Sequence, residues 1–123
     1  MAAEILGALD VDALAKDAAP MRRLVSRFSG KLLVHAEMEN GALYPRLLHS
    51  ADDDVRARAT ALYEEVKRIY ASFESYARRW PSAEAIAADP AGFVRDTRDV
   101  MRILGTRMRR ENDELYPMAD RVA

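Results

Sequence analysis

The residues with the most evident chemistry form two pairs whose members are four positions apart. His35 and Glu39 make up the first pair, and Arg107 and Glu111 make up the second. In a helix, residues four apart lie on the same side, so each pair would point in one direction. Imidazole nitrogens and carboxylate oxygens bind iron and other divalent metals, whereas a guanidinium pairs with carboxylates. The pairs therefore predict a metal site or an ion-pair network wherever the fold brings them together.

Each pair leads into a longer segment that occurs twice in the chain. The pattern Glu-Asn-x-x-Leu-Tyr-Pro spans 39–45 and again 111–117, with five identical positions at a constant offset. We expect the two tyrosines to pack between helices and to direct their hydroxyls at polar partners. We expect the two prolines to break or kink the ends of the helices that carry them.

The elements that must position these residues are helices. Apolar residues spaced by three and four run from Val55 to Trp80, a stripe typical of one long amphipathic helix. A similar stripe runs through the second helix and is expected to continue from Glu39 to Ala42. The first helix is the weakest, because glycine and aspartate residues interrupt it. The expected helices span 2–17, 20–48, 53–80 and 90–119, with a short extra turn in 82–88.

Short connections between long helices predict an all-α, up-down-up-down four-helix bundle, one domain over residues 1–123. In this topology the second and fourth helices run parallel, so the two copies of the repeat reach the same depth. Tyr63 and Tyr70, on either side of Val66, are expected to line that level of the core. Counting residues from the turns places six positions in one layer: Ala2, His35, Glu39, Val66, Arg107 and Glu111.

The His-x-x-x-Glu turn followed by Leu-Tyr-Pro gives the chain a family resemblance. It resembles the hemerythrin-like, HHE cation-binding domains over nearly its whole length, with four helices in the expected order. The resemblance implies a core that holds two irons, with histidines from all four helices and carboxylates from the second and fourth. It also implies a protein that carries or senses oxygen or iron.

Only part of that ligand set is present in this chain. The resemblance carries over to His35, Glu39 and Glu111, whereas Ala2, Val66 and Arg107 occupy the positions where the family has its other histidines. Arginine stays protonated and is not a normal metal ligand. We therefore predict that Arg107 lies between the two glutamates and replaces the metal with an ion-pair network that includes His35. Losing one member of such a network should cost about 3–5 kcal/mol.

A reduced metal site is the alternative to this network. His35, Glu39 and Glu111 would hold one iron or another divalent ion, with water or Tyr70 completing its coordination. An extension before the first helix would add a ligand at the same level. The remaining histidine, His49, is expected at the surface near a helix end.

Three functions follow from these alternatives. The first is a non-catalytic binding or regulatory module without a cofactor; its short first helix would leave a groove for a second copy, a protein partner or a small apolar ligand. The second is a metal- or oxygen-binding protein. The third, an enzyme using Glu39, Glu111 and His35 for proton transfer, is not favoured, because no nucleophile, phosphate-binding loop or cofactor motif accompanies these residues.

The composition narrows the classes of partner. Nineteen basic side chains balance twenty acidic ones, for a net charge of -1, which argues against nucleic acid or an anionic membrane as a partner. The chain has no cysteine, which excludes disulfides and thiolate metal sites. The first residues lack the basic start and apolar run of a signal peptide. We therefore expect a cytoplasmic protein of bacterial type.

Overall fold

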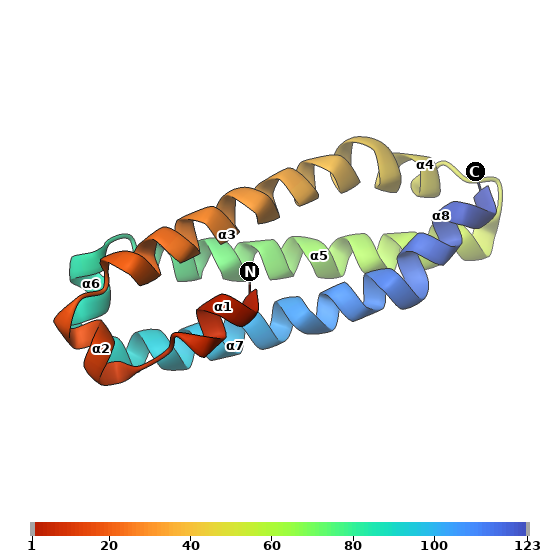
Figure 1. Cartoon of the computed structure of the whole chain (residues 1–123). Coiled ribbons are helices and arrows are strands. Elements are labelled where there is room, and N and C mark those ends of the chain that lie inside the picture. Colours follow the sequence, from red (N-terminus) through yellow and green to blue (C-terminus); the bar gives the residue numbers. More distant parts are fainter. Residues whose placement is uncertain (1, 123) are drawn as a thin grey trace.

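The structure of the chain is a computed structural model that describes residues 2–122, and within this range all regular elements are helical. Successive long helices run in alternating directions along one axis (Figure 1). This confirms the predicted all-α bundle. The elements are α1 (Ala2–Gly7), α2 (Val11–Lys16), α3 (Ala19–Met38), η1 (Glu39–Leu43), α4 (Tyr44–Leu48), α5 (Asp53–Arg79), α6 (Ala83–Ala88), α7 (Pro90–Arg110), η2 (Glu111–Leu115) and α8 (Tyr116–Val122).

Side-chain caps mark the start of four of these helices, α2, α5, α6 and α7. The Asp52 side chain accepts from the backbone of the first turn of α5, and Ser82 does the same for α6. Asp89 accepts from Gly92 N at 3.0 Å and starts α7, as its Asp-Pro signal predicts. The first helix differs from the prediction, because Asp10 is extended and caps a new helix, so 2–17 is divided into α1 and α2.

The repeated segments do not end their helices, so of the break or kink expected at the two prolines the structure excludes the break. Residues 39–43 and 111–115 form π-helical turns, and the chain then continues as α4 and α8. The amide of Tyr44 donates to Glu39 O, and that of Tyr116 donates to Glu111 O, a wider turn than in an α-helix. A proline lacks its own N–H and crowds the preceding turn. The wide turn accommodates both effects without a break.

The buried apolar side chains form two clusters at opposite ends of the bundle. The larger one joins α1, α2 and α6 to the nearby halves of α3, α5 and α7, and includes Phe73, Trp80 and Phe93. The smaller one joins α4 and α8 to the start of α5, around Tyr44 and Leu115. The charged side chains of Glu39, Arg107 and Glu111 are also buried and separate the two clusters along the helix axis.

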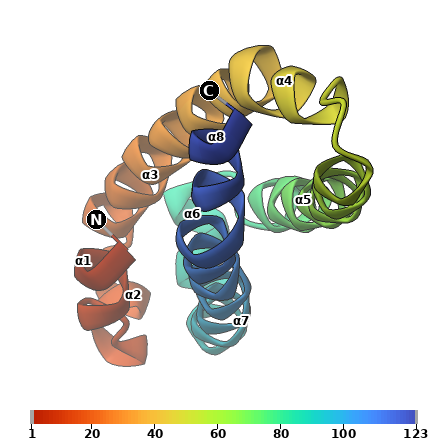
Figure 2. The same cartoon turned by 90° about the vertical axis from the view of Figure 1, so that its right-hand side faces the viewer.

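Helix α3 stands apart from the other long helices. Its closest backbone neighbours are α1 and α6, whereas α5 packs against α7 and α4. The view along the bundle shows α3, α5 and α7 at the corners of a triangle, with α3 set away from α5 (Figure 2). Leu33, Val34 and Met38 on α3 are each more than half exposed. The incomplete packing of α3 leaves hollows beside it.

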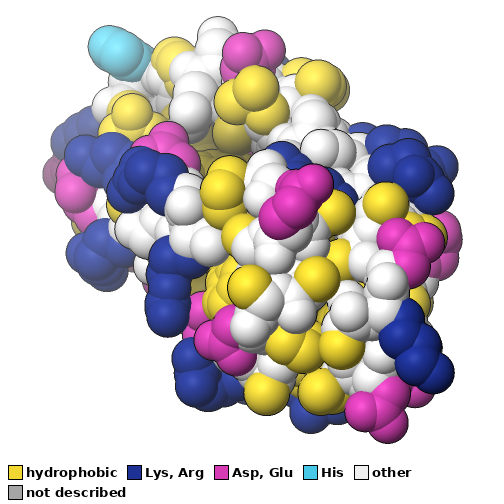
Figure 3. Space-filling view, turned by 90° about the vertical axis from the view of Figure 1, so that its left-hand side faces the viewer, with side chains coloured by type: hydrophobic (Ala, Val, Ile, Leu, Met, Phe, Trp, Pro, Cys, Tyr) yellow, Lys and Arg dark blue, Asp and Glu magenta, His cyan; other side chains and the backbone are white. Residues whose placement is uncertain are grey.

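Away from α3, the surface carries both charged and apolar side chains. At the end of the molecule formed by α2 and α6, side chains of both charges lie among scattered apolar ones (Figure 3). Within residues 2–122, none of the helices combines the length and the apolar character that a membrane-spanning segment requires.

Candidate functional site

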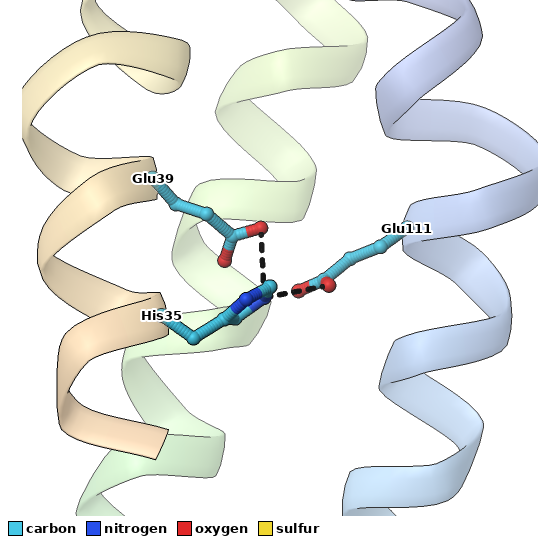
Figure 4. Close-up of side chains that lie close together, drawn as sticks. All are labelled: His35, Glu39 and Glu111. Atoms are coloured by element: carbon cyan, nitrogen blue, oxygen red, sulfur yellow. Dashed lines mark hydrogen bonds and ion pairs between the residues drawn. The ribbon is translucent and has the colours of Figure 1, made fainter. Parts of the chain in front are cut away.

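The two copies of the repeat meet in the core. His35 comes from the last turn of α3, and Glu39 and Glu111 are the first residues of the two π turns. His35 Nε2 lies 3.1 Å from Glu111 Oε2 and 3.4 Å from Glu39 Oε2. The imidazole therefore reaches both carboxylates from one side (Figure 4). One ligand atom from each residue falls within 4.8 Å of the others, which is close enough for a shared ion.

Arg107 joins this cluster from α7 and is only 3 % exposed. Its Nε donates to Glu111 Oε1 at 3.1 Å, and its Nη2 donates to the hydroxyl of Tyr44. We expected Arg107 to bond both glutamates, but its second partner is Tyr44 rather than Glu39. The π turn explains the change. Positions five apart diverge by roughly 140° around an α-helix, whereas a turn closed by an i→i+5 bond brings Tyr44 back to the face of Glu39.

Glu39 is the least satisfied member of the cluster. It is 4 % exposed, and neither of its oxygens accepts a hydrogen bond within the described part of the chain when both glutamates are ionised. Burial, and then the negative charge of Glu111, raise the pKa of Glu39 from 4.5 to about 7. A hydrogen bond from the protonated form to Glu111 contributes to the same rise, whereas the neighbouring His35 and Arg107 lower this pKa. Glu39 is therefore expected to keep its proton at mildly acidic pH, next to the carboxylate of Glu111.

Two tyrosines of the repeat belong to the same network, and sequence reasoning gave them only a packing role with a polar partner. Tyr44 is almost fully buried against Arg107, and Tyr116 OH donates to Glu111 Oε2 at 3.3 Å. Burial raises the pKa of each tyrosine to about 12, so both hydroxyls stay protonated at neutral pH. The sequence signal for this role was the Leu-Tyr-Pro that occurs in both copies of the repeat. Because α-helical periodicity was assumed, Ala42 was expected to face the core, but Ala42 is exposed and Tyr44 is buried instead.

The structure places the other residues predicted for this level of the core, Val66, Tyr70 and Tyr63, in two different environments. Val66 and Tyr70 line a cavity of about 200 Å³ beside His35 and Arg107. Burial raises the pKa of Tyr70. Tyr63 instead packs against the ring of Tyr44, with ring centroids 5.1 Å apart, and is not among the residues that line the cavity.

The structure also shows where the remaining two predicted residues, Ala2 and His49, lie. Ala2 is partly buried against the larger apolar cluster rather than in the cavity lining. His49 is exposed, and its Nδ1 lies 2.7 Å from Pro45 O, as expected for a helix end.

The donors present do not fit a centre of two irons. Among residues 2–121, three ligand-type side chains converge, and the buried guanidinium of Arg107, which bonds Glu111 and Tyr44, lies beside them. The same three donors fit one divalent ion in their chemistry, because imidazole and carboxylate suit iron and its neighbours. The unpartnered oxygens of Glu39 leave ligand atoms free for that ion.

Comparison with known proteins assigns the family. A family model described as the hemerythrin HHE cation binding domain matches residues 2–119. Comparison with curated proteins and with solved structures gives no significant match. The match covers nearly all of the chain, and the cluster of His35, Glu39 and Glu111 lies inside it. The chain therefore belongs to the hemerythrin HHE cation-binding domain family.

Proposed function

We propose that this hemerythrin-like bundle is a non-catalytic binding or regulatory module in which a network of Arg107, Glu111, Glu39 and His35 takes the place of the family's metal centre. The observation that carries the proposal is the buried pairing of Arg107 with Glu111 and Tyr44. A guanidinium cannot give up its proton to become a ligand. It supplies, inside the fold, the positive charge that a metal would otherwise bring.

Charge balance favours the same conclusion. The fixed positive charge of Arg107 balances one of the two glutamates, and a single proton on the cluster balances the other, so the layer needs no metal to be neutral. A divalent ion held by two ionised glutamates next to Arg107 would leave an excess of one positive charge. A buried uncompensated charge is strongly unfavourable, so binding the ion requires an additional anion.

A single divalent ion remains the second candidate, because one observation favours it. Both oxygens of Glu39 are buried without a hydrogen-bond donor within residues 2–121, and Oε2 lies 3.4 Å from the ring nitrogen Nε2 of His35. Such a site would hold one ion through three protein ligands, and its function would be to bind or sense iron, another divalent metal or oxygen. An acid–base enzyme has less support, since the same residues are accounted for by the network.

Metal content of unchelated protein separates the two candidates. In protein produced in iron-replete medium, we expect iron and other transition metals at background level and no near-ultraviolet oxo-bridge absorption. Stoichiometric metal in repeated preparations would overturn the proposal in favour of the single-ion site.

A gain-of-binding variant tests whether Arg107 prevents metal binding. The double substitution Val66→His with Arg107→His restores two ligand-type side chains to the layer and removes the guanidinium, so we expect iron binding to rise. A matched control, Val11→His with Arg27→His, adds two histidines at exposed positions of α2 and α3 and should leave metal content unchanged. Equal iron binding by both double variants would contradict the role given to Arg107.

A further inference from the structure

The outer side of α3 is a continuous exposed face. Helix α3 lies along one edge of the molecule (Figure 1), and its buried residues Met21, Val25 and Ala36 face the core. The opposite side carries seven residues, all exposed: Arg23, Ser26, Arg27, Gly30, Leu33, Val34 and Glu37. Each of the other six is three, four or seven positions from Gly30, so the seven share one side of the helix. We call this set the outer face of α3.

Apolar side chains stand on this outer face without cover. Leu33 and Val34 are each more than half exposed. Met38, one turn after Val34, is 68 % exposed and extends the apolar patch. Neighbouring apolar residues that project into solvent from one helix mark a surface that another molecule covers. The outer face therefore has the character of a docking surface.

Gly30 keeps the centre of the outer face low. A Cβ added at Gly30 would meet nothing within 4 Å, so the space above this residue is open. Ser26, one turn earlier, is also small. Two packed helices lie about 8–10 Å apart, and small side chains at the contact allow the shorter distances. A helix is thus the shape of partner that fits here.

The charges of the outer face are arranged symmetrically about Gly30. Arg23 lies seven residues before it and Glu37 lies seven residues after it. Seven residues are about two turns, so both charges point to the side of Gly30. Neither side chain takes part in the ion pairs formed among the described residues. In an antiparallel pair of α3 helices with a two-fold axis at Gly30, Arg23 of each copy lies opposite Glu37 of the other.

The rest of the outer face also matches itself in this arrangement. Residues before Gly30 on one copy meet residues after Gly30 on the other. Leu33 therefore lies over the small Ser26 of the second copy. Glu37 also comes within one turn of Arg27 of the second copy, whose guanidinium adds to the attraction. A surface that is complementary to itself under a two-fold axis favours a second copy of the same chain as its partner.

We propose that two copies of this chain associate through the outer face of α3, as an antiparallel pair of helices centred on Gly30 with Arg23 of each copy paired to Glu37 of the other. The proposal goes beyond the proposed function and does not depend on whether Arg107 replaces a metal. Because α3 has 20 residues and is about 30 Å long, the contact is smaller than the roughly 800 Å² per partner of a stable interface. We therefore expect a weak, reversible dimer with a dissociation constant between about 10 µM and 1 mM.

Sedimentation equilibrium of chelator-treated protein tests for this dimer. Between about 5 µM and 2 mM chain, the average mass should rise from that of one chain, 13.8 kDa, towards twice that value. A mass of one chain at every concentration would overturn the proposal, and the outer face would then serve a different partner or none.

Charge reversal tests the pairing of the two copies. Glu37→Arg turns two attractive contacts into repulsive ones, so the dimer should weaken about tenfold, and Arg23→Glu should act alike. The double variant, Arg23→Glu with Glu37→Arg, exchanges the two charges and should recover most of the parent affinity. Asp113→Arg is the control, because it makes the same change of charge at an exposed residue of η2, which meets the inner side of α3. A double variant as weak as either single variant would refute the pairing.

A change at the centre of the outer face locates the contact. Gly30→Gln adds a long side chain in open space, so the single chain should keep its fold, as circular dichroism can verify. Two such side chains meet at the two-fold axis, so self-association should weaken at least tenfold. Gly7→Gln on α1 is the matched control, since an added Cβ there also meets nothing within 4 Å. Parent-like association of Gly30→Gln would place the contact elsewhere and overturn the proposal, even if a charge variant fails to fold.

Discussion

At the scale of single residues, the unusual feature is a buried carboxyl pair with one guanidinium. The four-residue spacings predicted that His35, Glu39, Arg107 and Glu111 would share one level of the core, and the structure brings them together. What spacing could not predict is how the hydrogen bonds are distributed. That depends on the direction of each side chain, and Tyr44 reaches Arg107 only because its turn is not α-helical.

The carboxyl pair makes stability depend on pH. The pKa of Glu39 is raised from 4.5 to about 7 in the folded chain. Between these values the folded chain holds a proton that the unfolded chain has released, so the free energy of unfolding falls as pH rises. A shift of this size corresponds to about 3 kcal/mol. Chemical denaturation in chelator-containing buffer should therefore show decreasing stability from pH 5 to about pH 7, levelling off above.

The variant Glu39→Gln tests whether Glu39 causes this dependence of stability on pH. The amide cannot ionise, so the decline in stability across this pH window should be much smaller than in the parent chain. Glu37→Gln, on the exposed side of the same helix, serves as the control and should keep the parent slope. Parallel pH profiles for the parent chain and Glu39→Gln would contradict the assignment. A bound divalent ion would reverse the slope, because metal binding requires the ionised carboxylate.

At the scale of elements, local signals predicted the helices well. The Asp-Pro at 89–90 and the polar run before Asp53 mark the starts of α7 and α5, because capping needs only neighbouring residues. The π turns were missed for a physical reason. A proline predicts a disturbance in the hydrogen bonds of the preceding turn, but whether the helix ends, bends or widens is decided by what packs on either side.

Substituting alanine at two helical glycines should change the free energy of unfolding in opposite directions. Gly30 lies in α3 with nothing within 4 Å of an added Cβ, so Gly30→Ala should raise the free energy of unfolding. The expected gain is about 0.5–1 kcal/mol, the difference in helix propensity. At Gly92 an added Cβ would lie 2.3 Å from the Asp89 carboxylate that caps α7. Gly92→Ala should therefore displace the cap and cost about 1 kcal/mol. Urea denaturation midpoints measure both, and a shared sign would contradict this account.

At the scale of the whole molecule, the core is divided by its polar layer and α3 is loosely held. The apolar stripes predicted which face of each helix turns inward. They could not predict how closely α3 approaches α5, because periodicity gives a direction around the axis but no distance between axes. Leu24, Phe28 and Leu32 point inward as expected and yet remain partly exposed.

Hydrogen exchange should reveal this difference in packing. Amides in the middle of α3, residues 28–36, should open with a lower free energy than those of residues 59–73 in α5, since fewer neighbours must separate. Native-state exchange measured by mass spectrometry or NMR gives both values in one experiment. Equal protection of the two stretches would show that α3 is as firmly packed as α5.

The π turn at residues 39–43 makes the arrangement sensitive to the number of residues as well as to their identity. This turn contains one residue more than an α-helical turn would, and everything after it is rotated accordingly. Deleting Gly41, an exposed residue that contacts little, would turn the following residues by roughly 100°. Tyr44 would leave Arg107, and Leu47 would leave the smaller core cluster. A deletion at this inconspicuous position is therefore expected to disturb the site and the far end of the core together, while substitutions there are tolerated.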